Sequence, residues 1–277
     1  MNSEQQFDLV IAPGRTERNY WRDLWRYREM FYFLAWRDIL VRYKQTVFGV
    51  AWALVRPLVT MIVFTFVFGR LARLPSEGVP YPVMVFAGML PWQFFAAAVS
   101  ESANSLLSNA NLVSKVYFPR LIVPAAALMH ALVDFLISAV FLLVLMGWYG
   151  CWPDARVLAA PLFLLLACAV ALGPGLWLCA LNVRYRDFRY LVPFLIQLGL
   201  YISPVGFSSS VIPQQWRLLY SVNPMVGVID GFRWCLLRGS AGLYWPGFVL
   251  SVLLTALLLW GGLRYFRRTE KTFADVI

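Results

Sequence analysis

The sequence is poor in the residues that catalysis and metal binding require. Its 277 residues include one histidine, His130, and four cysteines that stand at no metal-ligand spacing. No Gly-Lys pair occurs, so the chain lacks the phosphate-binding loop of P-loop ATPases. We therefore expect no metal site, no catalytic residues and no cofactor bound by this chain.

Charged residues are also scarce. They make up 14% of the chain, against roughly a quarter in soluble domains, while 61% of the residues are hydrophobic. A net charge of +10 would suit a nucleic-acid partner, but the basic residues cluster just outside long apolar runs, where membrane proteins keep them. The composition predicts an integral membrane protein that does not bind nucleic acid.

Stretches that are nearly free of Asp, Glu, Lys and Arg predict an all-α protein with about six transmembrane helices. The expected spans are 47–69, 81–100 with a continuation towards 107, 121–147, 157–183, 190–208 and 240–263. With the N-terminus inside, seventeen of the 24 Lys and Arg residues fall in cytoplasmic segments and six in outside segments. This bias predicts a cytoplasmic segment 1–46, a transmembrane domain 47–265 and a cytoplasmic tail 266–277.

Two further segments are apolar without being plain spans. Residues 18–45 predict an amphipathic helix whose apolar face holds Leu24, Tyr27, Phe31 and Leu34. It would lie in the cytoplasmic membrane interface, or else pack as a soluble helix on a partner protein. Residues 209–239 hold a twelve-residue uncharged stretch that is too short to cross a bilayer. We expect a re-entrant or interfacial pair of short helices there, the alternative being a large extracytoplasmic loop.

Six short motifs follow one another from Arg37 to the C-terminus. They are RDILVRYKQT (37–46), YFPR (117–120), NVRYRD (182–187), SPV (203–205), NPM (223–225) and EKTFAD (270–275). Each is weak alone. In this order, and with this topology, they resemble the membrane subunit of bacterial ABC transporters that export O-antigen, capsule or teichoic acid.

The resemblance implies a multi-pass permease of the bacterial inner membrane with both termini in the cytoplasm. It would form a homodimer, bind two copies of a separate ATP-binding subunit that holds ATP and magnesium, and export a lipid-linked (undecaprenyl-type) polysaccharide. By the same resemblance, segment 109–120 docks on the ATPase and segment 211–234 forms an extracytoplasmic gate. The docking residues are then Asn111, Lys115, Tyr117, Phe118 and Arg120, and the gate residues are Pro213, Asn223 and Pro224.

Arg56 lies inside the first apolar run, where a charge is costly. Together with Arg37, Arg42 and Lys44 it would attract the lipid pyrophosphate at the cytoplasmic opening, because arginine pairs with phosphate oxygens. The alternative is that Arg56 reaches the inner headgroups and has no substrate role.

Aromatic residues make up 17% of the chain, and sugar rings stack on aromatic faces. The candidates for lining a glycan conduit are Phe86, Trp92, Phe94, Phe95, Trp177 and Tyr201. Any single ring can instead face lipid or other helices.

Glu101 and Asp134, inside predicted spans, either stabilise the bundle or indicate a proton-coupled secondary transporter. A small-lipid or drug exporter on the same scaffold is the other alternative. The acids are too dispersed for a lipid-glycan enzyme.

Overall fold

The structure is a computed structural model that describes residues 20–44, 49–185, 187–238 and 242–273. Within these ranges the chain is helical and contains no strand. The α-helices are α1 (Tyr20–Arg26), α2 (Arg28–Lys44), α3 (Gly49–Phe64), α4 (Tyr81–Ser108), α5 (Ala110–Lys115), α6 (Ile122–Trp148), α7 (Ala160–Arg184), α8 (Phe188–Ile202), α9 (Gln214–Tyr220), α10 (Pro224–Leu236) and α11 (Trp245–Thr269). The other helical segments are the π-helix η2 (Thr65–Leu71) and the short 3-10 helices η3 (Ala155–Ala159), η4 (Ser209–Val211) and η5 (Glu270–Thr272).

Five helical segments are long and apolar enough to cross a membrane: Leu54–Leu71, Tyr81–Ser108, Ile122–Trp148, Ala155–Arg184 and Trp245–Thr272. They correspond to five of the six expected spans. The sixth, expected at 190–208, is the apolar helix α8 of 15 residues. At 1.5 Å per residue α8 is about 22 Å long, less than the hydrocarbon core. The chain continues beyond it as irregular backbone.

Proline sets the start of several helices. It occupies the first or second position of α4, α7, α10 and α11, where its missing N–H leaves no hydrogen bond unmade. The central helix of the bundle is α4, which packs against α6 and α7. In its most apolar stretch 72% of the residues are buried, compared with 11% for Leu54–Leu71. The first span therefore lies at the periphery and exposes apolar side chains such as Ile62 and Phe66.

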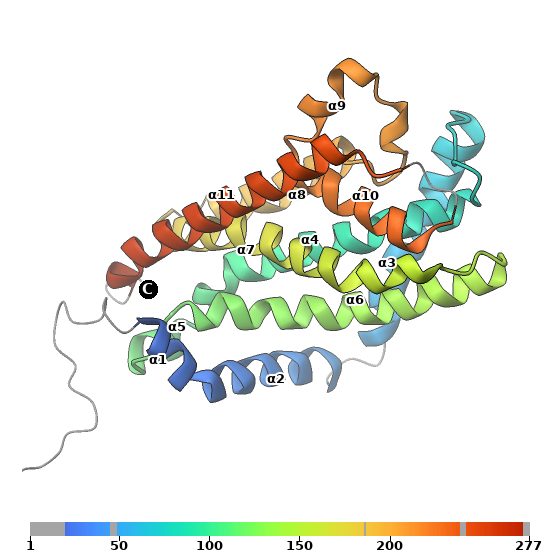
Figure 1. Ribbon diagram of the computed structural model, residues 1–277. Coiled ribbons are helices and arrows are strands. Elements are labelled where there is room, and N and C mark those ends of the chain that lie inside the picture. The colour runs from blue at the N-terminus through green and yellow to red at the C-terminus, as the bar shows by residue number, and fades with distance from the viewer. Residues whose placement is uncertain (1–19, 45–48, 186, 239–241, 274–277) are drawn as a thin grey trace, which may run out of the picture.

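The helix expected over 18–45 is two helices, α1 and α2, which meet at Tyr27. Its predicted apolar face is confirmed. Leu34 is buried, and Leu24, Tyr27 and Phe31 pack against the same cluster, which includes Phe118. Helix α2 runs alongside α6, and α1 lies with α5 at the end of the bundle where α11 finishes (Figure 1). The placement of α1 and α2 in the membrane interface stays a prediction.

The region 209–239 contains the two short helices that the sequence predicts. Helix α9 is largely exposed, whereas α10 packs among α4, α7 and α11 with most of its side chains buried. The described structure thus contains an internal helix just before the last span. Its depth in a membrane stays a prediction.

Candidate functional site

A cavity of about 1140 Å³ opens between α3, α4, α6 and α8. Its surface on α4 is one face of the helix, since Phe86, Leu90, Gln93, Ala97 and Glu101 recur every three or four residues. Matching faces of α3, α6 and α8 complete the walls. Helix α8 approaches α4 closely because residue 199 is glycine: a Cβ there would lie 2.7 Å from Cη2 of Trp92.

Four ionisable side chains gather at one part of the cavity. Arg42, on α2, forms an ion pair of 2.7 Å with Asp134 of α6 and lies 4.0 Å from Glu101 of α4. Tyr43 donates a hydrogen bond to the other carboxylate oxygen of Asp134. Burial and this hydrogen bond raise the pKa of Tyr43, so its hydroxyl remains a donor. The carboxylate inside α6 is therefore stabilised by the N-terminal helix.

The cluster extends to the single histidine, because Nδ1 of His130 lies 3.9 Å from Glu101. Glu101 has a half-exposed side chain and Asp134 a largely buried one. Among the described residues no group of three or more His, Cys, Asp and Glu side chains could hold a metal ion.

Arg56 projects from α3 into the same cavity. Its side chain is exposed, and within the described ranges it forms no ion pair. The structure thus brings together Arg42 and Arg56, two of the four basic residues expected at the cytoplasmic opening. Lys44 is exposed at the end of α2 and does not line the cavity.

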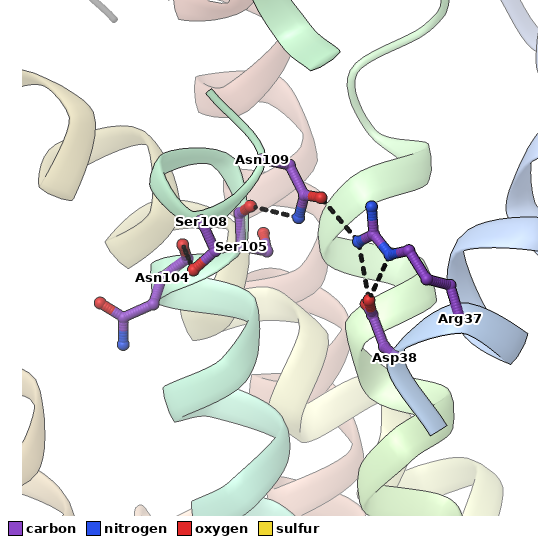
Figure 2. A network of polar contacts seen from close by, with 6 residues as sticks. All are labelled: Arg37, Asp38, Asn104, Ser105, Ser108 and Asn109. Carbon is purple, nitrogen blue, oxygen red and sulfur yellow. Dashed lines mark hydrogen bonds and ion pairs between the residues drawn. The ribbon is translucent and has the colours of Figure 1, made fainter. Parts of the chain in front are cut away.

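The fourth of these residues, Arg37, belongs to a separate polar network (Figure 2). Its guanidinium donates to Asp38 at 2.7 Å and to the side-chain oxygen of Asn109 at 2.7 Å. The Asn109 amide in turn donates to the carbonyl of Ser105 at 2.9 Å. Arg37 therefore connects α2 to the point where α4 ends and α5 begins.

Three of the six expected conduit aromatics, Phe86, Trp92 and Phe94, line the cavity. Each is less than 5% exposed, so they form its wall and do not project as free rings. Phe95 packs against Trp92 with ring centroids 5.3 Å apart. Phe95 does not line the cavity, and neither do the other two candidates. Trp177 covers Gly261 of α11, and Tyr201 is exposed on α8.

The sequence reasoning missed two amide side chains in the cavity, Gln93 of α4 and Gln197 of α8. Both stand alone as long polar residues within apolar runs, and that isolation is the feature that could have indicated them. Neither side chain has a hydrogen-bond partner within the described ranges. Ser138 of α6 adds a hydroxyl to the same surface.

The segment expected to dock on an ATPase has an exposed side and an anchored side. Asn111, Lys115 and Tyr117 are exposed. Phe118 is 4% exposed within the cluster that also holds Leu34 and Phe266, and Arg120 donates a hydrogen bond to the carbonyl of Glu270.

Glu270 also connects this segment to the first described helix. Its carboxylate accepts a hydrogen bond of 3.0 Å from the Tyr20 hydroxyl. Burial is the main cause that raises the pKa of Tyr20, so the hydroxyl keeps its proton. The start of α1, the docking segment and the end of α11 thus form one structural unit.

The three residues expected in the gate lie around α9 and α10. Pro213 directly precedes α9, and Pro224 is the first residue of α10. Asn223 caps α10 by accepting from the Met225 N–H at 3.1 Å, and its amide donates to the Ser203 hydroxyl at 2.9 Å. This contact connects the start of α10 to the end of α8.

The sequence reasoning also missed the role of Arg233, which is one of the six basic residues that it placed in outside segments. Arg233 is 5% exposed and donates to the carbonyls of Met84, Val205 and Phe207 at 3.3, 2.8 and 2.7 Å. Glycine at 88 makes room for it, since a Cβ there would lie 2.5 Å from Nη2 of Arg233. The guanidinium satisfies two carbonyls of the irregular chain beyond α8 and also reaches one carbonyl of α4.

Comparison with known proteins extends these observations. A family model described as ABC-2 type transporter matches residues 29–237. The chain is 28% identical over 259 residues to the O-antigen export system permease protein RfbA of Myxococcus xanthus, covering 92% of this chain and 98% of that protein.

Two further relatives cover most of the chain. A protein of the same description from Klebsiella pneumoniae is 27% identical, over 87% of this chain and 92% of that protein. The polysialic acid transport protein KpsM of Escherichia coli is 24% identical, over 85% of this chain and 91% of that protein.

Proposed function

The chain belongs to the ABC-2 type transporter family, and on that premise we propose that it is the permease subunit of a polysaccharide exporter. It exports a lipid-linked glycan across the bacterial inner membrane, with both termini in the cytoplasm. Two copies form the path, and two copies of a separate subunit bind ATP and magnesium. The relatives include O-antigen permeases and a polysialic acid transport protein, and their names support a polysaccharide as the substrate.

The observation that carries this proposal is the cavity with Arg56 on its wall. A volume of about 1140 Å³ exceeds most sites for small ligands. Arg56 presents a guanidinium to it without an ion-pair partner among the described residues. A lipid pyrophosphate is a suitable partner, because arginine binds phosphate oxygens bidentately. The glycan would follow along the cavity.

The activity is tested by reconstituting the chain in proteoliposomes with and without its ATP-binding subunit. We expect ATP-dependent transfer of a lipid-linked glycan only when both are present. Transfer driven by a proton gradient without the subunit would contradict the proposal and favour a secondary transporter. The ion pair of Asp134 with Arg42 argues against that alternative, because this carboxylate already has a fixed cationic partner.

Arg56→Ala tests the proposed phosphate contact. We expect export to fall about tenfold at unchanged membrane abundance, because the lost contact is charge-assisted. Arg56→Lys keeps the charge without the bidentate geometry and should retain part of the activity. Arg70→Ala, in the same span but outside the cavity, is the matched control and should export normally. Normal export by Arg56→Ala would contradict the pyrophosphate contact and favour the alternative, in which Arg56 only reaches the lipid headgroups.

A further inference from the structure

The charges on the cavity wall balance one another. Arg42 and Arg56 face Glu101 and Asp134, so the described lining carries two positive and two negative groups. Arg42 is engaged by both carboxylates. Residues 45–53, which precede the cavity-lining part of α3, contain no charged side chain in the sequence. Arg56 is thus the only cation on the described lining that is left for a substrate anion.

The rest of the polar lining is uncharged. Gln93, Gln197 and Ser138 present amides and a hydroxyl to the cavity. An amide offers two donors and an acceptor oxygen, so it can pair with a sugar hydroxyl in either direction. The described ranges supply no partner for either glutamine side chain, which leaves these groups for a ligand.

The charged and uncharged groups lie at different heights along α4. Glu101 is seven residues before the end of the helix at Ser108, about 10 Å, whereas Gln93 is fifteen residues before it, about 22 Å. A chain that moves along the cavity from the α5 end of α4 meets Glu101 and the charges paired with it first. It then passes the amides over buried aromatic walls.

Such a path suits a polymer without charge. An acidic sugar would pass Glu101 and Asp134 with only one free cation near them, and would then enter a lining that offers no positive charge. Burying an unpaired anion there is costly. A second copy of the chain would present the same residues and would leave the balance unchanged.

We propose that the polysaccharide this permease carries is neutral, and that Gln93 and Gln197 contact its hydroxyl groups as it passes. This inference rests on the proposed function and names the substrate class of the same cavity. The anionic group of the substrate is then confined to its lipid-linked head, which Arg56 binds.

The test uses the permease with its ATP-binding subunit in proteoliposomes and two substrates. Both have the same lipid pyrophosphate and chain length; one glycan contains only neutral hexoses, and in the other every second residue is a uronic acid. We expect ATP-dependent transfer of the neutral glycan to be about tenfold faster or more. Equal rates, or faster transfer of the acidic glycan, would overturn the inference and leave the proposed function intact. Transfer of neither glycan would overturn the proposed function itself.

Gln197→Lys supplies an independent readout. Gln197 is exposed to the cavity, so a lysine fits there and adds the missing cation. We expect the acidic glycan to move several-fold faster in this variant than in the unaltered protein. Ala155→Lys adds the same charge on the exposed turn η3, away from the cavity, and should leave both rates unchanged. If Ala155→Lys accelerated transfer of the acidic glycan and Gln197→Lys did not, the proposed contact between Gln197 and the glycan would be contradicted.

Discussion

At the scale of single residues, an ionisable group inside a span is stabilised by side chains from another part of the chain. Asp134 lies twelve residues into α6, and its two oxygens bind Arg42 and Tyr43 of α2. A lone carboxylate at this depth would be costly. The pairing therefore holds the N-terminal helix against the bundle.

The Arg42–Asp134 pair can be tested by a double-mutant cycle. Asp134→Leu removes the carboxylate and leaves Arg42 with the more distant Glu101, at 4.0 Å. We expect a loss of about 1–3 kcal/mol, below the value for a fully buried pair because Arg42 is 40% exposed. Adding Arg42→Met should restore part of the stability. Thermal unfolding in detergent measures both, and purely additive losses would argue against the coupling.

At the scale of elements, the short helix α8 depends on a side chain of α10. Helix α8 ends at Ile202, and two carbonyls of the irregular chain beyond it are bound by Arg233. Irregular backbone at membrane depth is tolerated only when its polar groups are satisfied. The same guanidinium reaches Met84 of α4, so one residue joins three segments.

Arg233→Met is expected to destabilise the protein by about 3 kcal/mol or more, because buried carbonyls lose charge-assisted hydrogen bonds. Arg233→Lys should be intermediate, since an ammonium cannot reproduce the fork of the guanidinium. Arg238→Met, at an exposed position two residues beyond α10, is the control and should change little. Melting temperature and membrane abundance report the effect. Similar melting temperatures for the two Met variants would contradict this role.

At the scale of the whole molecule, the two ends of the described chain meet beside the segment expected to bind the ATPase. Tyr20 and Arg120 both contact Glu270, and Phe118 is buried with Phe266 and Leu34. A force on the exposed side of α5 would therefore be transmitted to the end of α11 and to α1. This arrangement suits a site where a separate motor subunit acts.

Lys115→Glu is expected to weaken co-purification of the ATP-binding subunit about tenfold without lowering thermal stability, because Lys115 is exposed. Arg22→Glu reverses an exposed charge on α1 and is the control. Phe118→Ala should instead lower stability by about 3–5 kcal/mol, since it empties a buried site. Unchanged co-purification of Lys115→Glu would remove this face of α5 from the interface.

Much of this architecture was predictable from the sequence. Long uncharged runs predict spans because a bilayer admits few alternatives to a helix. The apolar face with Leu34, and the short helices between α8 and α11, followed from spacing and proline. The sequence also singled out Arg56 as a charge in an apolar run.

The tertiary structure decided which side chains meet. It placed Arg56 in one cavity with Gln93 and Gln197, engaged Arg37 with Asn109 instead, and made Arg233 an internal donor. Such contacts join residues far apart in the chain and depend on how helices rotate and pack, which local periodicity does not specify. The sequence by itself determined a helical membrane protein that lacks a P-loop, because composition and run length report transfer to the bilayer directly. Packing alone gave Arg37 and Arg233 their partners and placed Arg56, Gln93 and Gln197 at the cavity.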